Sequence, residues 1–150
     1  MKKTIYILVV GLIILASCTN NQGEINEQRK LDFAEYIDTP TTIEFEDMNF
    51  DFGNIVDGDL VHKTFKFTNT GKTDLILLTV KGSCGCTVPE DWPKHPIAPG
   101  DEGEIKVTFN SANRVGNTRK TIRIEANTMP TVTVLTITGV VNPNVTVEEK

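Results

Sequence analysis

The 150-residue sequence has few imidazoles and thiols, which serve as bases, nucleophiles and soft metal ligands: two histidines and three cysteines. It contains no C-x-x-C pair, the usual spacing of a thioredoxin-like dithiol. A zinc site needs four ligands, and the only imidazoles are those of His62 and His95. No Ser/His/Asp set, carboxylate pair or phosphate-binding glycine loop stands out. These absences argue against an enzyme.

The sequence also lacks an apolar run long enough to cross a membrane as a helix. The run at residues 5–15 has about eleven residues, whereas a transmembrane helix needs about twenty. Two lysines precede it, which is typical of a secretory signal peptide. The run ends in Leu-Ala-Ser-Cys at residues 15–18, which resembles the lipobox of bacterial lipoproteins. That resemblance implies cleavage before Cys18 and acylation of its sulfur and its new amino group.

Positive charge is scarce as well. Removal of Lys2 and Lys3 with the signal peptide would take the formal net charge from −5 to −7. An acidic domain has no electrostatic footprint for nucleic acid, so we expect no nucleic-acid partner. It gains nothing from anionic lipid either, so membrane attachment must come from the acyl chains on Cys18. The predicted location is the cell envelope, lipid-anchored and facing the periplasm.

Composition divides the chain into four parts. Residues 1–17 are the predicted signal peptide, and residues 18–40 are the lipidated Cys18 and a flexible tether. Residues 41–141 contain short alternating apolar segments separated by turn residues, the pattern of β-strands. Residues 142–150 are polar, and we expect them to form a loose tail.

About seven strands are predicted in residues 41–141, with no helix of useful length. This number of short strands, with turns about every 8–12 residues, is typical of an all-β, immunoglobulin-like sandwich. A barrel is the alternative. The Cys–Trp–Cys pattern of antibody domains is absent, because two of the cysteines are close together in one segment.

Several details of the strands can be predicted. Alternation places Phe65 and Phe67 in the core, and likewise Ile105 and Val107. The apolar segment 75–80 predicts a central strand covered on most sides. A slip of the apolar phase after Val134 predicts a β-bulge in the last strand, 132–141. Residues 89–100 contain four prolines and predict an ordered loop.

Reactive chemistry is concentrated where Cys84 and Cys86 flank Gly85. In an extended strand their Cα atoms would be roughly 6.6 Å apart, the long end for a disulfide. Gly85 lets the backbone tighten. Three states stay open: a local disulfide, two buried thiols, or a soft pair of ligands for Cu(I) that His95 could complete. Copper is the one candidate cofactor.

The single tryptophan, Trp92, lies in the proline-rich loop. Rigid loops with aromatic residues at one end of a sandwich often bind partners, so Trp92 is a candidate contact for a protein or a glycan. The alternative is that Trp92 covers the core beneath its own loop.

Five further stretches stand out in the sequence: FDFGNI at 50–55, FKFTNTG at 65–71, SCGCT at 83–87, IAPG at 97–100 and GEIKV at 103–107. Together they resemble a bacterial family known as domain of unknown function 1573. The resemblance covers about residues 50–141. The chain looks like a Bacteroidetes-type lipoprotein member of this family with a single copy of the domain. It implies an immunoglobulin-like fold related to the major-sperm-protein and pilus-chaperone sandwiches. It implies no established activity.

The sequence therefore predicts a non-enzymatic, lipid-anchored binding or structural module of the cell envelope. It would act through a loop end or through a strand edge that accepts an added strand. The partner would be an envelope protein or a glycan. The alternative is a copper(I)-binding or thiol-redox accessory protein that uses Cys84 and Cys86.

Overall fold

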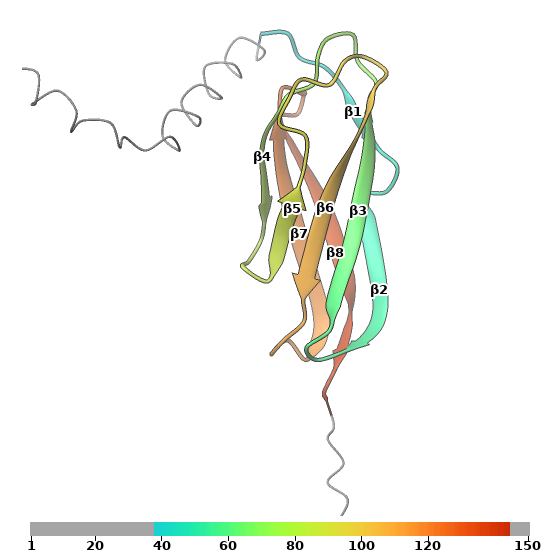
Figure 1. Cartoon of the computed structure of the whole chain (residues 1–150), viewed down its shortest axis with the longest axis vertical. Helices are drawn as coiled ribbons and strands as arrows, with labels where there is room; N and C mark the ends of the chain where they lie inside the picture. Colours follow the sequence, from blue (N-terminus) through green and yellow to red (C-terminus); the bar gives the residue numbers. More distant parts are fainter. Residues whose placement is uncertain (1–37, 145–150) are drawn as a thin grey trace, which may run out of the picture.

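The computed structural model describes residues 38–144, which form two facing four-stranded sheets (Figure 1). The sheets have the orders β1-β3-β6-β5 and β2-β8-β7-β4. The strands are β1 (Ile43–Phe45), β2 (Asn49–Val56), β3 (Leu60–Asn69), β4 (Leu77–Gly82), β5 (Thr87–Asp91), β6 (Glu102–Asn110), β7 (Gly116–Ala126) and β8 (Val132–Asn142). None of residues 38–144 belongs to a helix long and apolar enough to cross a membrane. The predicted signal peptide and Cys18 lie outside these residues.

The two sheets enclose a core built from the side chains that alternation predicts. Phe65 and Phe67 of β3 are buried, as are Ile105 and Val107 of β6. Full burial of a side chain of this size contributes about 1.5–3 kcal/mol. The all-β, immunoglobulin-like sandwich predicted from the sequence is confirmed.

The last strand, β8, contains no bulge where the sequence predicted one. It pairs with β7 from Val132 to Val141 without a register shift. The apolar phase slips because Val134 faces solvent, with 43% of its surface exposed. The irregularity lies instead in β2, whose register against β8 shifts between Asp51 and Asn54. The prediction placed the bulge in β8, whereas it lies in β2, the strand that pairs with β8.

The apolar segment 75–80 enters β4 at Leu77, and β4 is an edge strand and not a central one. Among the described strands, β4 pairs with β7 alone. A register shift between Leu77 and Thr79 changes which residues face the core. Leu77 and Val80 are therefore both buried, and Leu78 between them is half-buried. The apolar run reflects this bulge, so the prediction of a central strand was wrong.

The strand β5 is an eighth strand that the sequence did not predict. It covers the start of the proline-rich stretch that was expected to be a loop. A loop was expected there because a proline such as Pro89 has no backbone N–H to donate to a neighbouring strand. Within the described sheets β5 pairs only with β6. Proline is tolerated on such an edge strand, where one side of the backbone needs no ladder partner.

The loops β3–β4, β5–β6 and β7–β8 gather at the end of the sandwich where residue 38 lies (Figure 1). Buried Asn69 fixes two of them. Its side-chain nitrogen donates to the carbonyl oxygens of Thr73 and Ile97, both at 2.8 Å. Its oxygen accepts hydrogen bonds from Thr41 Oγ1 and from the amide of Gly71. The loop after β5 is therefore ordered, as its prolines predict.

Candidate functional site

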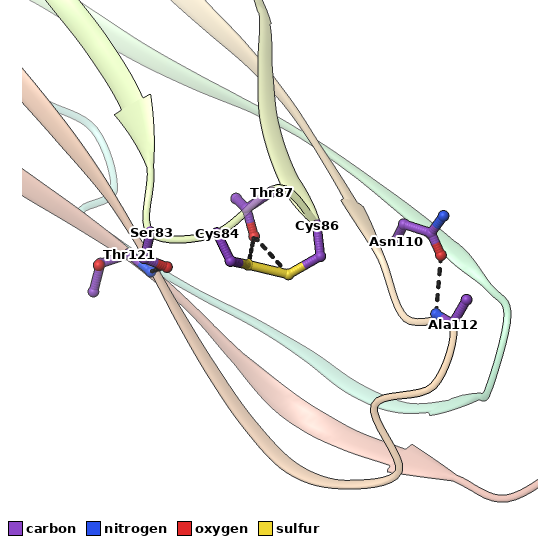
Figure 2. The surroundings of a disulfide bond; sticks show 7 residues. All are labelled: Ser83, Cys84, Cys86, Thr87, Asn110, Ala112 and Thr121. Carbon is purple, nitrogen blue, oxygen red and sulfur yellow. Dashed lines mark hydrogen bonds between the residues drawn. A yellow bond between two sulfur atoms is a disulfide. The ribbon is translucent and has the colours of Figure 1, made fainter.

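The two cysteines form a disulfide in a tight turn between β4 and β5 (Figure 2). Their Cα atoms are 5.3 Å apart, shorter than an extended strand would allow. The amide of Thr87 donates to the carbonyl oxygen of Cys84 at 3.1 Å, which closes the turn. Gly85 is exposed at its tip. Of the three states left open by the sequence, the structure has the disulfide.

The turn is hydrogen-bonded to both sheets. On one side the amide of Ser83 donates to the carbonyl oxygen of Thr121 in β7 at 2.8 Å. On the other side the amide of Asn110, at the end of β6, donates to the carbonyl oxygen of Cys86 at 2.8 Å. The disulfide joins neighbouring residues and cannot staple the sheets. The backbone that carries it links them (Figure 2).

The two sulfur atoms have different surroundings. Cys86 is 7% exposed and packs with Phe109 and Val141 in a second, smaller apolar cluster. Cys84 is half-buried against the same cluster. The hydroxyl of Thr87 lies 3.9 Å from both sulfurs. An attacking thiolate therefore has better access to Cys84, and a hydroxyl lies beside either leaving sulfur.

The predicted copper set of Cys84, Cys86 and His95 is not assembled. His95 follows β5, whereas the cysteines precede it, so the strand separates them. Five extended residues span about 15 Å, which is too far for a shared metal ion. Within residues 38–144 no three His, Cys, Asp or Glu side chains are grouped to hold a metal ion. The prediction that His95 reaches back to the cysteines was wrong, because residues 87–91 form a strand.

The structure gives Trp92 the role of covering the core, and its role as a partner contact stays a prediction. Trp92 is half-buried and packs against the main core, so it covers the core beneath its loop. It also lines an open cleft of about 350 Å³. The other lining residues are Asp91, Pro93, Lys94, His95 and Glu104. This cleft lies at the opposite end of β5 from the disulfide.

One ion pair borders this cleft. Lys106 donates to a Glu104 carboxylate oxygen at 2.9 Å, across a surface where both side chains are about half exposed. This hydrogen bond and the charge of Glu104 raise the pKa of Lys106 above its ordinary value. Asp91 raises it further from the neighbouring strand. The wall of the cleft thus carries mixed charge.

The outer edge of β4 is a feature that the sequence did not reveal. Lys81 of β4 lies opposite Arg123 of β7 in the sheet, and both side chains are exposed. Arg119, four residues earlier in β7, is exposed on the same face. The apolar run at 75–80 was the available signal. It indicates an edge only once the bulge after Leu77 is known.

Comparison with solved structures agrees with the fold. A protein of unknown function from Porphyromonas gingivalis matches with a TM-score of 0.59 and 16% identity, over 67% of this chain and 47% of that protein. The chain thus spans about half the length of that relative. The ASH/PapD-like domain 7 of human CEP192 matches at 0.56 and 11% identity, over 71% and 89% of the two chains. The secreted serine protease VesC of Vibrio cholerae matches at 0.52 and 12%, over 75% and 25%.

At these identities the likeness shows the fold alone. No curated protein matches the sequence. The family described as "Protein of unknown function (DUF1573)" matches residues 43–141, nearly the whole of the sandwich. The resemblance seen in the sequence motifs is therefore confirmed, and the chain belongs to the DUF1573 family.

Proposed function

We propose that this protein is a non-enzymatic binding module of the cell envelope, held to a membrane by lipid on Cys18. It binds an extended, acidic segment of another envelope protein along the open edge of β4. The signal peptide and the lipobox-like residues 15–18 support the location. The single observation that supports this binding mode is that, of the four edge strands, β4 is the one best suited to pair with an added strand.

Each of the four edge strands carries a feature that discourages strand addition, and in β4 it is confined to the register shift between Leu77 and Thr79. β1 has three residues, which is too short to template a partner. β2 is interrupted by its bulge after Asp51, and β5 contains Pro89 with a register shift beside it. β4 has neither proline nor an irregularity from Thr79 to Gly82. Its edge is the one best suited to accept a strand.

The unpaired groups of this edge can be assigned. The hydrogen bond from Ser83 to Thr121 identifies a bonded pair in the β4–β7 ladder. Because bonded and non-bonded pairs alternate, Lys81 also bonds to β7. The N–H and C=O groups of Val80 and Gly82 therefore point away from the sheet. An added strand would satisfy four backbone groups there.

Charge indicates which partner this edge prefers. The whole chain has a formal net charge of −5, yet Lys81 and Arg123 lie side by side next to the open edge. Arg123 is paired to Glu125 at 3.2 Å, whereas Lys81 is an exposed residue of the edge strand itself. Acidic residues on the outer face of a partner strand would complement this pair.

Two peptides test the proposal. The first alternates valine with aspartate and glutamate, and the second carries lysine and arginine in their place. Titration of the purified protein should show tighter binding of the acidic peptide, by up to about fivefold for each cross-strand charge pair. At saturation the amides of Val80 and Gly82 should exchange more slowly with solvent. Equal binding of both peptides, or unchanged exchange at these amides, would refute the proposal.

Charge reversal supplies the matched control. Lys81→Glu combined with Arg123→Glu should reverse the preference between the two peptides. Lys66→Glu makes a like-signed change at an exposed site in β3 of the other sheet and should leave the preference unchanged. A similar effect of both variants would indicate a non-specific response to net charge.

A second candidate function is thiol exchange, favoured by the unequal burial of the two sulfurs. A client thiolate would attack Cys84 Sγ, the disulfide would break, and Cys86 would leave as a thiolate beside the hydroxyl of Thr87. A second thiol of the client would then displace Cys84, so that the client is oxidised and the protein becomes a dithiol. Oxidised glutathione is a suitable probe. Cys86→Ser should form a mixed disulfide faster than Cys84→Ser, and equal rates would exclude this order of attack.

A further inference from the structure

The cleft after β5 has a chemistry that the β4 edge does not explain. It combines the indole of Trp92 with two carboxylates, Asp91 and Glu104, within a volume of about 350 Å³. Pro93, Lys94 and His95 complete its lining. It belongs to the other sheet and lies at the other end of β5 from the disulfide.

The indole is held in place before any ligand arrives. One side of Trp92 packs against the main core. The loop that follows is tied down by Ile97, which exchanges backbone hydrogen bonds with Leu75 at 2.9 and 3.0 Å. The buried side chain of Asn69 holds the carbonyl oxygen of Ile97 as well. A rigid aromatic side chain loses little conformational entropy when it binds a ligand.

A cation already occupies the face of this indole. The ammonium group of Lys94 lies over the Trp92 ring. The negative face of an indole attracts cations, and tryptophan is the best aromatic residue for this purpose. Asp91 and Glu104 add negative charge in the same cleft. Lys106 is already bonded to Glu104, so the charge of that carboxylate is partly compensated, and Asp91 is the second carboxylate of the lining.

We propose that this cleft binds a cationic side chain, an ammonium or a guanidinium group, of a partner protein. Lys94 is its internal occupant, and a ligand cation replaces the Lys94 ammonium over Trp92. Lys94 is exposed and has a long flexible side chain, so it can move into solvent. When it does so, Asp91, Glu104 and Lys106 leave the cleft with one net negative charge to receive the ligand.

The single tryptophan of the chain makes the test direct, because fluorescence of the full-length protein in detergent reports on Trp92 alone. The probe is Nα-acetyl-lysine methylamide, and its control is the norleucine analogue, which has a similar shape without the charge. We expect a saturable change in emission with the lysine probe, weakened by salt. Norleucine should give none. If the two probes behave alike, or if neither changes the emission, the proposal is wrong.

Variants identify Lys94 as the competitor. Lys94→Ala should tighten binding of the lysine probe by about two- to fivefold, the range expected for an exposed cation–π contact. Lys72→Ala removes the same charge from the β3–β4 loop, outside this cleft, and should have no effect. Weaker binding in Lys94→Ala would show that Lys94 belongs to the site and does not compete for it.

Two further experiments complete the test: substitution of a carboxylate in the cleft, and titration with a neutral sugar. Asp91→Asn should weaken binding of the lysine probe more than Asp101→Asn, a matched change at an exposed position of the β5–β6 loop outside the cleft. N-acetylglucosamine is the probe for a glycan site. Saturable binding of this neutral sugar in place of lysine would overturn the cationic assignment. Because this cleft and the β4 edge lie in different sheets, failure of one proposal leaves the other standing.

Discussion

Gly82 and Thr87 bring the ends of β4 and β5 into direct contact, since a Cβ on Gly82 would overlap the carbonyl oxygen of Thr87. That oxygen belongs to a strand and cannot move without displacing the strand. We expect Gly82→Ala to lower the free energy of unfolding by about 1–3 kcal/mol, measured by urea denaturation. Gly85→Ala is the matched control, because nothing lies within 4 Å of its Cβ position. It should stay within about 0.5 kcal/mol of the parent. Equal losses in both would contradict this contact.

The disulfide should stabilise the protein modestly. It closes a loop of only three residues, Cys84 to Cys86, so the loss of loop entropy is worth about 1–2 kcal/mol. Serine at both positions should therefore leave a folded sandwich that unfolds at lower urea concentration. A reductant should lower the stability of the parent by a similar amount and leave the double variant unchanged. A reductant effect on the double variant would show that the disulfide is not the cause.

Asn69 should matter far more than its size suggests. Its side chain makes four hydrogen bonds in a fully buried position. Asn69→Ala removes the partner of the buried Thr41 hydroxyl and of the half-buried backbone groups of Gly71 and Thr73, and should cost at least about 2 kcal/mol of stability. Asn110→Ala removes one exposed hydrogen bond, to the amide of Ala112 at 2.9 Å, and should cost well under about 1 kcal/mol. Thermal unfolding of the two variants compares them directly, and similar losses would contradict the role of Asn69.

The pair of Glu104 and Lys106 should be visible in a pH titration. Its hydrogen bond raises the pKa of Lys106 above 10.5, so the folded state holds this proton more tightly than the unfolded state. The stabilising effect is present below pH about 10.5 and is lost as the pH rises through the folded pKa. Glu104→Gln should return the pKa of Lys106 toward its ordinary value, followed by NMR of the carbon next to the ammonium. An unchanged midpoint would mean that the pair does not form in solution. Both side chains are exposed, so we expect little change in overall stability.

Burial within a strand was predictable because it depends on local alternation. Phe65 and Ile105 are apolar with polar neighbours, and a period of two places such residues on the core face of any sheet. The possibility of a Cys84–Cys86 bond was predictable for the same reason, since Gly85 permits the required backbone. These properties depend on a few neighbouring residues.

The order of the strands was not predictable, and the candidate sites depend on it. Nothing in residues 75–80 distinguishes a central strand from a bulged edge strand, because both are rich in apolar residues. Pro89 made β5 hard to predict, because proline is rare within strands. Without β5, neither the disulfide turn that joins the two sheets nor the separation of His95 from the cysteines could be derived. Trp92 was assigned two alternative roles, and its place at a loop end allows both at once.

The position of β8 between β2 and β7 has a consequence for how the chain folds. Asn49 of β2 pairs in parallel with Thr136 of β8. The first strand of this sheet in the sequence therefore cannot pair until the last strand has been synthesised. Contacts so distant in sequence require a large loop to close before they contribute, which slows folding. Until β8 has left the ribosome, the second sheet lacks the inner strand that joins β2 to β7. For a chain with the proposed signal peptide, this delay would favour threading through a secretion channel.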